Sequence, residues 1–110
     1  MSLSKLTLFY DEIYSSGLDR TARFPVDRYQ LLARKLFEHD YQNSIFLGNP
    51  RLATKEEILL VHEKSYIERF LNHQLKEDEI RRIGLRPWKD AIVERTLRLT
   101  GGALDALDCV

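Results

Sequence analysis

The sequence holds a single cysteine, Cys109, and no long apolar run. One cysteine cannot form a disulfide within the chain, so a disulfide-stabilised secreted scaffold is excluded. No stretch approaches the ~18 apolar residues of a membrane-spanning helix, and residues 1–10 lack the basic start and apolar core of a signal peptide. We therefore expect a soluble cytoplasmic protein with no membrane partner.

The chain also lacks an excess of charge of either sign. Its 110 residues include 17 Lys and Arg and 17 Asp and Glu, so the formal net charge is zero. Nucleic-acid binding depends on uncompensated basic side chains that contact phosphates, so the charge balance argues against a nucleic-acid partner. The one basic cluster is Arg81, Arg82 and Arg86. It follows the acidic residues 77–79, which indicates a solvated face of mixed charge.

Motifs for a metal or a nucleophile are missing as well. The stretch LVHEKSY around His62 begins like the H-E-x-x-H helix of zinc proteases, but Tyr66 stands where the second histidine is needed. His39 and His73 fall on other expected helices, without ligand spacing. A nucleophilic Cys–His pair from Cys109 would need a base and an orienting group, and the sequence identifies neither. We assign no catalytic residue, metal ligand or cofactor to this chain.

The first half of the chain has the pattern of an opening α/β unit. Short runs of apolar and β-branched residues at 5–10 and 44–50 predict two strands. Residues 11–25 predict a long loop, and about 25–39 a helix. The apolar stripe of that helix contains Tyr29, Leu31, Leu32, Leu36 and Phe37. Strand, helix, strand predicts a parallel sheet, although two strands are too few to complete a doubly wound one.

The second half predicts successive helices. Thr54 with Glu57, and Ser65 with Glu68, have capping-box spacing and predict helices at about 54–62 and 65–74. A short helical turn follows and ends at Gly84. A long helix then follows Pro87, with one face formed by Val93, Thr96, Leu97, Thr100, Leu104 and Leu107.

Two adjacent glycines, Gly101 and Gly102, interrupt this last helix. Each is about 1 kcal/mol less favourable than alanine inside a helix. Their presence predicts the close approach of another backbone segment.

Four segments, read in order, resemble the N-terminal part of histone deacetylase superfamily proteins. They are ARFPVDRYQLL, LLVHEKSYIERFL, IGLRPW and VERTLRLTGGALDAL. The class IV and bacterial acetoin-utilisation-like branch is the most similar. The resemblance extends from Leu6 to Val110. It implies that residues 1–110 are an incomplete N-terminal segment of one catalytic domain with the three-layer, parallel-sheet arginase/deacetylase fold, mostly helical here with two short strands.

The same resemblance implies a function for the complete protein. Such a protein is a zinc-dependent deacetylase, a hydrolase that cleaves an acetylated small molecule or an acyl-lysine with metal-activated water. In the family, the zinc ligands and the paired catalytic histidines follow the T-G-G helix, and this sequence contains none of them. We therefore expect the chain alone to be inactive and to bind no zinc. Asp90 lies too far into its helix to match the peptide-binding aspartate of class I relatives, which argues against histone-tail recognition.

Two residues are implicated in a substrate or product channel by the resemblance. The loop 14–24 matches the family loop that lines the substrate entrance, with Tyr14 at its mouth. Arg23 lies near the arginine of the product channel. Two alternatives stay open: Arg23 as a surface residue that pairs with Asp19 or Asp27, and Tyr14 as a packing residue.

Four further residues form a structural signature of the family: His62, Tyr66, Gly101 and Gly102. We expect His62 to be buried and hydrogen-bonded across the junction of two helices, with Tyr66 packed nearby. A supporting role for His62 behind the catalytic groups is the alternative.

A second hypothesis comes from the incomplete sheet. Unpaired strand edges invite pairing with another chain, so the protein could be a stand-alone interaction module that forms a homo-oligomer through its exposed sheet edge, without catalysis.

Overall fold

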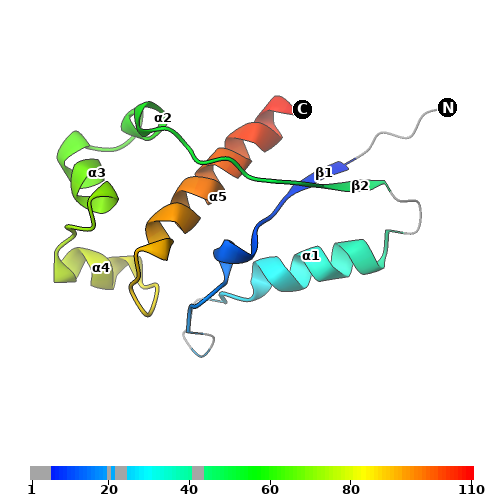
Figure 1. Cartoon of the computed structure of the whole chain (residues 1–110), viewed down its shortest axis with the longest axis horizontal. Helices are drawn as coiled ribbons and strands as arrows, with labels where there is room; N and C mark the ends of the chain where they lie inside the picture. Colours follow the sequence, from blue (N-terminus) through cyan, green and yellow to red (C-terminus); the bar gives the residue numbers. More distant parts are fainter. Residues whose placement is uncertain (1–5, 20, 22–24, 41–43) are drawn as a thin grey trace.

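The computed structural model describes residues 6–19, 21, 25–40 and 44–110, and it has a mixed helix-and-strand fold (Figure 1). The elements are β1 (Leu6–Phe9), a 3₁₀ turn η1 (Glu12–Tyr14), α1 (Arg28–Glu38), β2 (Ile45–Gly48), α2 (Lys55–Leu59), α3 (Lys64–Leu71), α4 (Glu77–Ile83) and α5 (Ala91–Asp108). Helices make up 53% of the structure and the two short strands are parallel, which confirms the α/β class expected from the sequence.

The sheet pairs β1 with β2 in parallel, from Leu6 opposite Ile45 to Phe9 opposite Gly48. Parallel neighbours need a crossover, and α1 supplies it beside the strands (Figure 1). The ring of Phe9, which pairs with Gly48, leaves little room for a side chain at that position. A Cβ added at Gly48 would lie 2.8 Å from a ring carbon of Phe9.

Helix α1 begins three residues later than the sequence predicted. The Arg28 amide donates to the Pro25 carbonyl at 3.1 Å, so residues 25–27 form a turn that precedes the helix. Its buried residue is Ala33, whereas Leu31 and Leu32 are each 57% exposed. The predicted stripe is therefore apolar as expected, but much of it faces away from the described core.

Helices α2 and α3 begin with different caps. The predicted capping box of α2 is confirmed: the Glu57 amide donates to the Thr54 hydroxyl at 3.1 Å, and the Thr54 amide donates to the Glu57 carboxylate at 2.8 Å. The capping box predicted at Ser65 is wrong. Helix α3 starts at Lys64 with Glu63 at its N-cap position, so Ser65 lies inside the first turn, where its hydroxyl donates to the Glu63 carboxylate at 2.6 Å.

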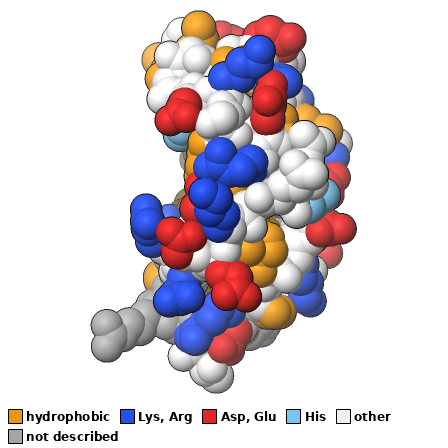
Figure 2. Space-filling view, turned by 90° about the vertical axis from the view of Figure 1, so that its left-hand side faces the viewer, with side chains coloured by type: hydrophobic (Ala, Val, Ile, Leu, Met, Phe, Trp, Pro, Cys, Tyr) orange, Lys and Arg blue, Asp and Glu red, His pale blue; other side chains and the backbone are white. Residues whose placement is uncertain are grey.

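Helix α4 ends at Gly84, as predicted, because Gly84 adopts a left-handed conformation with φ of 79°. Side chains of mixed charge cover the surface in this region, and Figure 2 shows basic and acidic groups interspersed over it. Arg82 pairs with Asp78 at 3.0 Å, and Arg69 of α3 pairs with Glu79 at 2.7 Å. These pairs agree with the solvated, mixed-charge face expected there.

Helix α5 runs diagonally between the β1–β2 pair and the α2–α4 group (Figure 1). One buried cluster sits at its start, where Ile92 packs with Leu18, Val26 and Leu85. Val93 of the predicted apolar face of α5 is buried, as expected. Leu107 of the same face is 70% exposed, because no described residue covers the last turn.

The molecule is a flat slab of 53 × 34 × 16 Å. Its radius of gyration is 16.1 Å, whereas a compact domain of this size has about 13 Å. No described helix combines the length and apolar character needed to span a bilayer.

Candidate functional site

The carboxyl end of β1 leads directly into η1, and ligands of open α/β sheets bind beyond such strand ends. Asp11 fixes the turn there, because its carboxylate accepts from the Ile13 amide at 2.9 Å. A polar hollow of about 190 Å³ lies beside it, lined by Tyr10, Glu12, Ser15, Ser16 and Gln30. Ser15 and Ser16 of the hollow belong to the loop 14–24, which the sequence analysis assigned to a substrate entrance.

Tyr14 lies in the interior behind this hollow, with 4% of its surface exposed. Its ring meets Tyr10 and Tyr29 edge-on, at centroid distances of 5.8 and 5.4 Å. The hydroxyl donates to the Arg98 carbonyl at 3.4 Å, and burial, followed by the Asp11 carboxylate, raises its pKa. The structure thus gives Tyr14 the packing position that the sequence analysis left open.

A side chain of helix α5 also holds the loop, through a hydrogen bond to the loop backbone. The buried Arg95 guanidinium donates through Nε to the Tyr14 carbonyl at 2.7 Å, and burial lowers the pKa of Arg95. The sequence analysis missed Arg95, because a charged residue on a helix is normally exposed. Arg23 lies outside the described residues, and Asp19, one of its alternative partners, accepts from the Thr21 hydroxyl at 2.7 Å.

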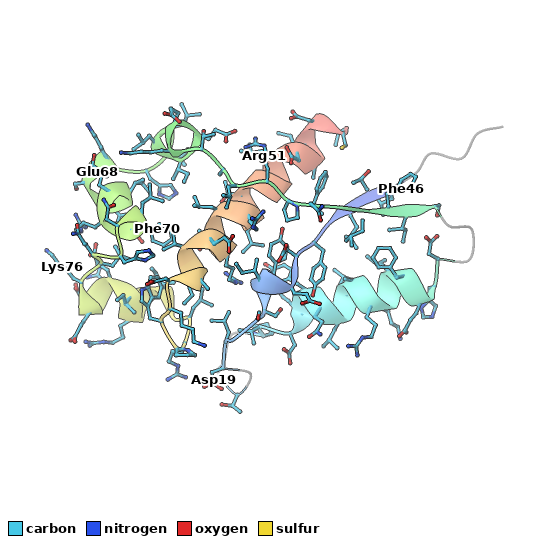
Figure 3. All side chains as sticks on the ribbon, viewed as in Figure 1. Asp19, Phe46, Arg51, Glu68, Phe70 and Lys76 are labelled. Atoms are coloured by element: carbon cyan, nitrogen blue, oxygen red, sulfur yellow. The ribbon has the colours of Figure 1, made fainter. Side chains whose placement is uncertain are left out.

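The segment after β2, which carries Arg51, crosses α5 (Figure 3), and the two glycines of α5 contact this segment. A Cβ added at Gly101 would lie 1.9 Å from the Arg51 carbonyl oxygen, and one added at Gly102 would lie 3.0 Å from the Pro50 Cβ. The Ala53 amide donates to the Leu97 carbonyl at 3.0 Å and closes the crossing. The predicted close approach of another backbone is confirmed at Gly101, whereas the nearest atoms at Gly102 belong to the side chains of Pro50 and Tyr14.

Arg51 joins three parts of the chain at this crossing (Figure 3). Its guanidinium donates to Glu57 of α2 at 2.8 Å and to Asp105 of α5 at 2.9 Å. The bonds from Arg51, followed by the Thr54 amide, lower the pKa of Glu57 to about 2. The sequence offered no signal for this network beyond the capping box, since Arg51 and Asp105 are 54 positions apart.

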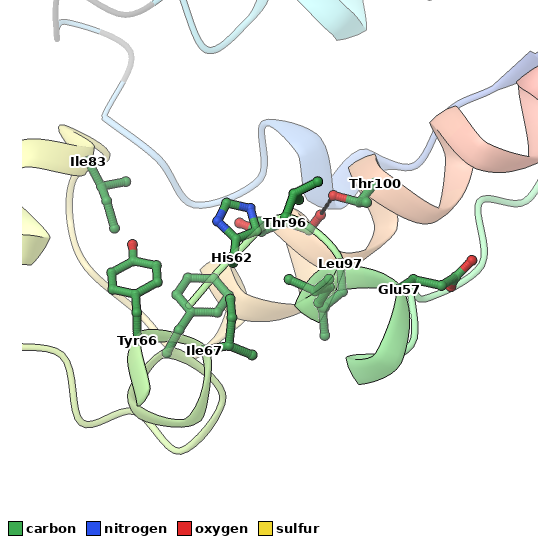
Figure 4. Close-up of a pocket in the computed structure, with 11 residues that line it drawn as sticks. Glu57, His62, Tyr66, Ile67, Ile83, Thr96, Leu97 and Thr100 are labelled. Atoms are coloured by element: carbon green, nitrogen blue, oxygen red, sulfur yellow. Dashed lines mark hydrogen bonds between the residues drawn. The ribbon is translucent and has the colours of Figure 1, made fainter. Parts of the chain in front are cut away.

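His62 and Tyr66 line a second, apolar pocket of about 240 Å³ between the α2–α3 turn and α5 (Figure 4). The expectation that His62 is buried is wrong: it is exposed, because α2 ends at Leu59 and the turn places His62 at the rim. Its ring makes no hydrogen bond with any other described residue. Tyr66 stacks on Phe70, with ring centroids 6.5 Å apart and 19° between the planes.

The residues that the structure describes do not fit a zinc centre. Within residues 6–19, 21, 25–40 and 44–110, no three His, Cys, Asp or Glu side chains gather closely enough to hold one metal ion. His62 and Tyr66 share a pocket, Gly101 and Gly102 lie at the crossing, and Tyr14 adjoins Gly102, where its hydroxyl oxygen would be 3.1 Å from an added Cβ.

No protein-family model matches the chain. The chain is 32% identical over 95 residues to an uncharacterized protein of the cyanobacterium Picosynechococcus sp.. The matched region covers 86% of this chain and 31% of that relative. The chain therefore spans about a third of the length of the curated relative that it matches.

Proposed function

We propose that these 110 residues form the N-terminal portion of a zinc-dependent deacetylase-like domain. The whole domain would hydrolyse an acetylated small molecule or an acyl-lysine with metal-activated water. The proposal assigns the zinc ligands and the catalytic histidines to sequence outside these residues. It rests on the four ordered segments that resemble the family, and a relative about three times as long is compatible with it.

The observation that carries the proposal is the crossing at Gly101 and Gly102. The family resemblance implies a T-G-G helix that packs beneath the loops of the active site. Here the two glycines lie against Arg51 and Pro50, and Gly102 also adjoins the buried Tyr14 of the loop that leaves β1. A helix this close to both segments sets the position of the loop at the carboxyl end of β1, where a substrate entrance is expected.

This chain would supply walls and support, and the proposal assigns the proton transfers of the reaction to residues outside it. Arg95 holds the Tyr14 carbonyl through its guanidinium, and Asp11 holds the turn through the Ile13 amide. Residues of the same turn and loop, Glu12 and Ser16 among them, line the polar hollow. Backbone held at both ends keeps an entrance open without the entropy loss of ordering it at each turnover.

The test is to produce the protein encoded by the complete reading frame and to measure bound zinc and the release of acetate. An acetyl-lysine peptide and an acetylated diamine are suitable substrates. We expect one zinc per chain and turnover of at least one substrate, both lost on chelation. The 110-residue chain is the control and should show neither. A complete protein without metal-dependent hydrolysis, or turnover by the short chain, would contradict the proposal.

A stand-alone oligomerising module is the second candidate. It is favoured by large apolar side chains at the sheet and on α1: Phe46, Leu47, Leu31 and Leu32 are each more than half exposed. Monomeric proteins rarely leave large contiguous apolar patches uncovered. Multi-angle light scattering of the 110-residue chain tests it, with Leu47→Lys as the variant. A dimer that Leu47→Lys dissociates favours the module, whereas a monomer at every concentration removes it.

A further inference from the structure

We propose that the free edge of β1 pairs with the β1 edge of a second copy of this chain, in the antiparallel direction and about a twofold axis at Leu8. This pairing rests on the second candidate function, the oligomerising module, and gives it a defined edge and register. The β1–β2 pair lies on the opposite side of α5 from α2–α4 (Figure 1), so the two copies would meet away from those helices.

The hydrogen bonds of the sheet show which backbone groups of β1 are free. The Leu6 and Tyr10 amides donate to carbonyls on the β2 side, at 2.8 and 3.4 Å. Because successive residues of a strand alternate in direction, the amides and carbonyls of Thr7 and Phe9 face away from β2. No described residue pairs with these groups. The edge of β1 therefore presents donors and acceptors at strand spacing, and a further β-strand is the partner that satisfies all of them.

The outer edge of β2 is less suited to such pairing. By the same alternation the Ile45 and Leu47 amides face outward, but the Ile45 amide already donates to the Asp40 carboxylate at 2.9 Å. Charged side chains on an edge strand are a common device against pairing with another chain. Residues 6–9 of β1 carry no charge. The sheet is thus protected at its β2 edge and open at its β1 edge.

A second copy fits the β1 edge because this edge is complementary to itself. A twofold axis presents the same strand in the opposite direction, so two copies pair antiparallel. With the axis at Leu8, Thr7 lies opposite Phe9 of the second copy, and Phe9 lies opposite its Thr7. Each of these pairs exchanges two hydrogen bonds, so every free group on both edges is used. A shift of the axis to Thr7 or to Phe9 would pair only one of these residues with an outward-facing group of β1.

The side chains between these hydrogen bonds also come together. In this register Leu8 lies opposite Leu8 of the second copy, and Leu6 lies opposite its Tyr10. Such non-hydrogen-bonded pairs have the closest side chains, with Cα atoms about 4.5 Å apart. Leu6 is 55% exposed in the single chain, and the Tyr10 ring of the second copy would cover it. The contact removes apolar surface from water on both copies, which favours association.

Hydrogen exchange of the unchanged 110-residue chain is the first test. NMR follows the amides of Thr7, Phe9 and Leu47 in a dilute and a concentrated sample. We expect the Thr7 and Phe9 amides to exchange about tenfold more slowly once ~90% of the chains are paired, because exchange then occurs from the free fraction. The Leu47 amide, which faces outward on β2, is the matched control and should exchange at the same rate in both samples.

A cross-link tests the register. Leu8→Cys in a Cys109→Ser chain places two thiols opposite each other at the axis, with Cα atoms inside the range of about 4.4–6.8 Å that a disulfide spans. Mild oxidation should therefore convert this variant to a covalent dimer. Leu60→Cys, at a position 83% exposed on the α2–α3 turn, is the control and should link only as fast as random collision allows.

A proline tests the hydrogen bonds themselves. Thr7→Pro removes an outward amide and no bond to β2, a position at which an edge strand tolerates proline. We expect the variant to keep the fold and to dimerise at least about tenfold more weakly, because each dimer loses two hydrogen bonds. The fold of each variant is checked by its NMR spectrum, and the exchange experiment decides the question without any variant.

Three results would overturn the inference. A monomer at every concentration would remove both this pairing and the oligomerising module. A dimer that Leu47→Lys dissociates, but whose Thr7 and Phe9 amides exchange as in the monomer, would keep the module and remove only the β1 pairing. Slow exchange of these two amides that does not change with concentration would show that another part of the same chain covers the edge. The deacetylase proposal is tested separately, by zinc and turnover in the complete protein.

Discussion

Gly101 of α5 and Arg51 are so close that a Cβ on the glycine would lie 1.9 Å from the arginine carbonyl oxygen. That distance is far inside van der Waals contact, and the neighbouring atom is backbone, which cannot rotate away. Fifty positions separate the two residues along the chain. The packing of α5 on the segment after β2 therefore depends on a residue without a side chain.

We predict that Gly101→Ala destabilises the fold by about 3 kcal/mol or more, because either α5 or the Arg51 segment has to move. The helix propensity gained by alanine, about 1 kcal/mol, is too small to offset this. Gly102→Ala should have a smaller effect, since its closest contacts are side-chain atoms at 3.0 and 3.1 Å. Urea denaturation of both variants tests the order. A Gly101→Ala chain as stable as the wild type would show that the crossing is looser than described.

Gly84 gives a prediction in which only backbone conformation matters. A Cβ there would have no atom within 4 Å, but φ is 79°. Gly84→Ala should lower the free energy of unfolding by about 1–2 kcal/mol, the cost of a left-handed non-glycine residue. Gly84→Asn should lose less, because asparagine tolerates this conformation. Thermal unfolding of the pair is the measurement, and equal losses for both would argue against the conformational explanation.

Two variants of Tyr14 distinguish the contribution of its ring to stability from that of its hydroxyl. Tyr14→Phe removes only the 3.4 Å bond to the Arg98 carbonyl, so we predict a loss below about 1 kcal/mol. Tyr14→Ala removes a buried ring between Tyr10 and Tyr29 and should cost about 3–5 kcal/mol. Chemical denaturation compares the two. If Tyr14→Phe were as damaging as Tyr14→Ala, the hydroxyl would have a role that the packing does not explain.

Glu57 makes stability depend on acid pH. Its pKa is lowered from 4.5 to about 2 in the folded chain, so its contribution is complete above about 4.5 and is lost as the pH falls toward 2. We predict that the wild type is more stable than Glu57→Gln at pH 7 and that this difference shrinks between pH 4.5 and 2. Denaturation at a series of pH values measures it. Glu56→Gln, on the same turn but exposed, is the matched control and should show no such convergence.

The features predicted correctly from the sequence are those decided by near neighbours. Thr54 and Glu57 are three residues apart and satisfy each other's amides, so their spacing alone identifies the cap. Gly84 ends its helix for an equally local reason. Ser65 failed, although its spacing to Glu68 was as good, because α3 begins at Lys64 with Glu63 at the N-cap position, so Ser65 lies inside the helix.

Non-local packing was beyond the sequence. Gly101 predicted the close approach of another backbone segment, but nothing in the sequence identified the segment around Arg51 as the one that approaches. The stripe that contains Leu31 and Leu32 predicted a helix correctly, yet amphipathic spacing does not say what covers the apolar side. The same is true of the candidate site. The sequence identified Tyr14 as a residue of interest, but it could not predict the contact of Tyr14 with Arg95, 81 positions away.

The parallel pairing of β1 with β2 has a kinetic consequence. Parallel neighbours cannot meet through a tight turn, and Leu6 must find Ile45 across the whole of α1. The contact between Tyr14 and Arg95 closes an even longer loop. Folding slows as contacts become more distant in sequence. A chain that is 53% helical should therefore fold at the rate of a mixed α/β domain, with α2 to α4 gaining protection from hydrogen exchange before the strands do.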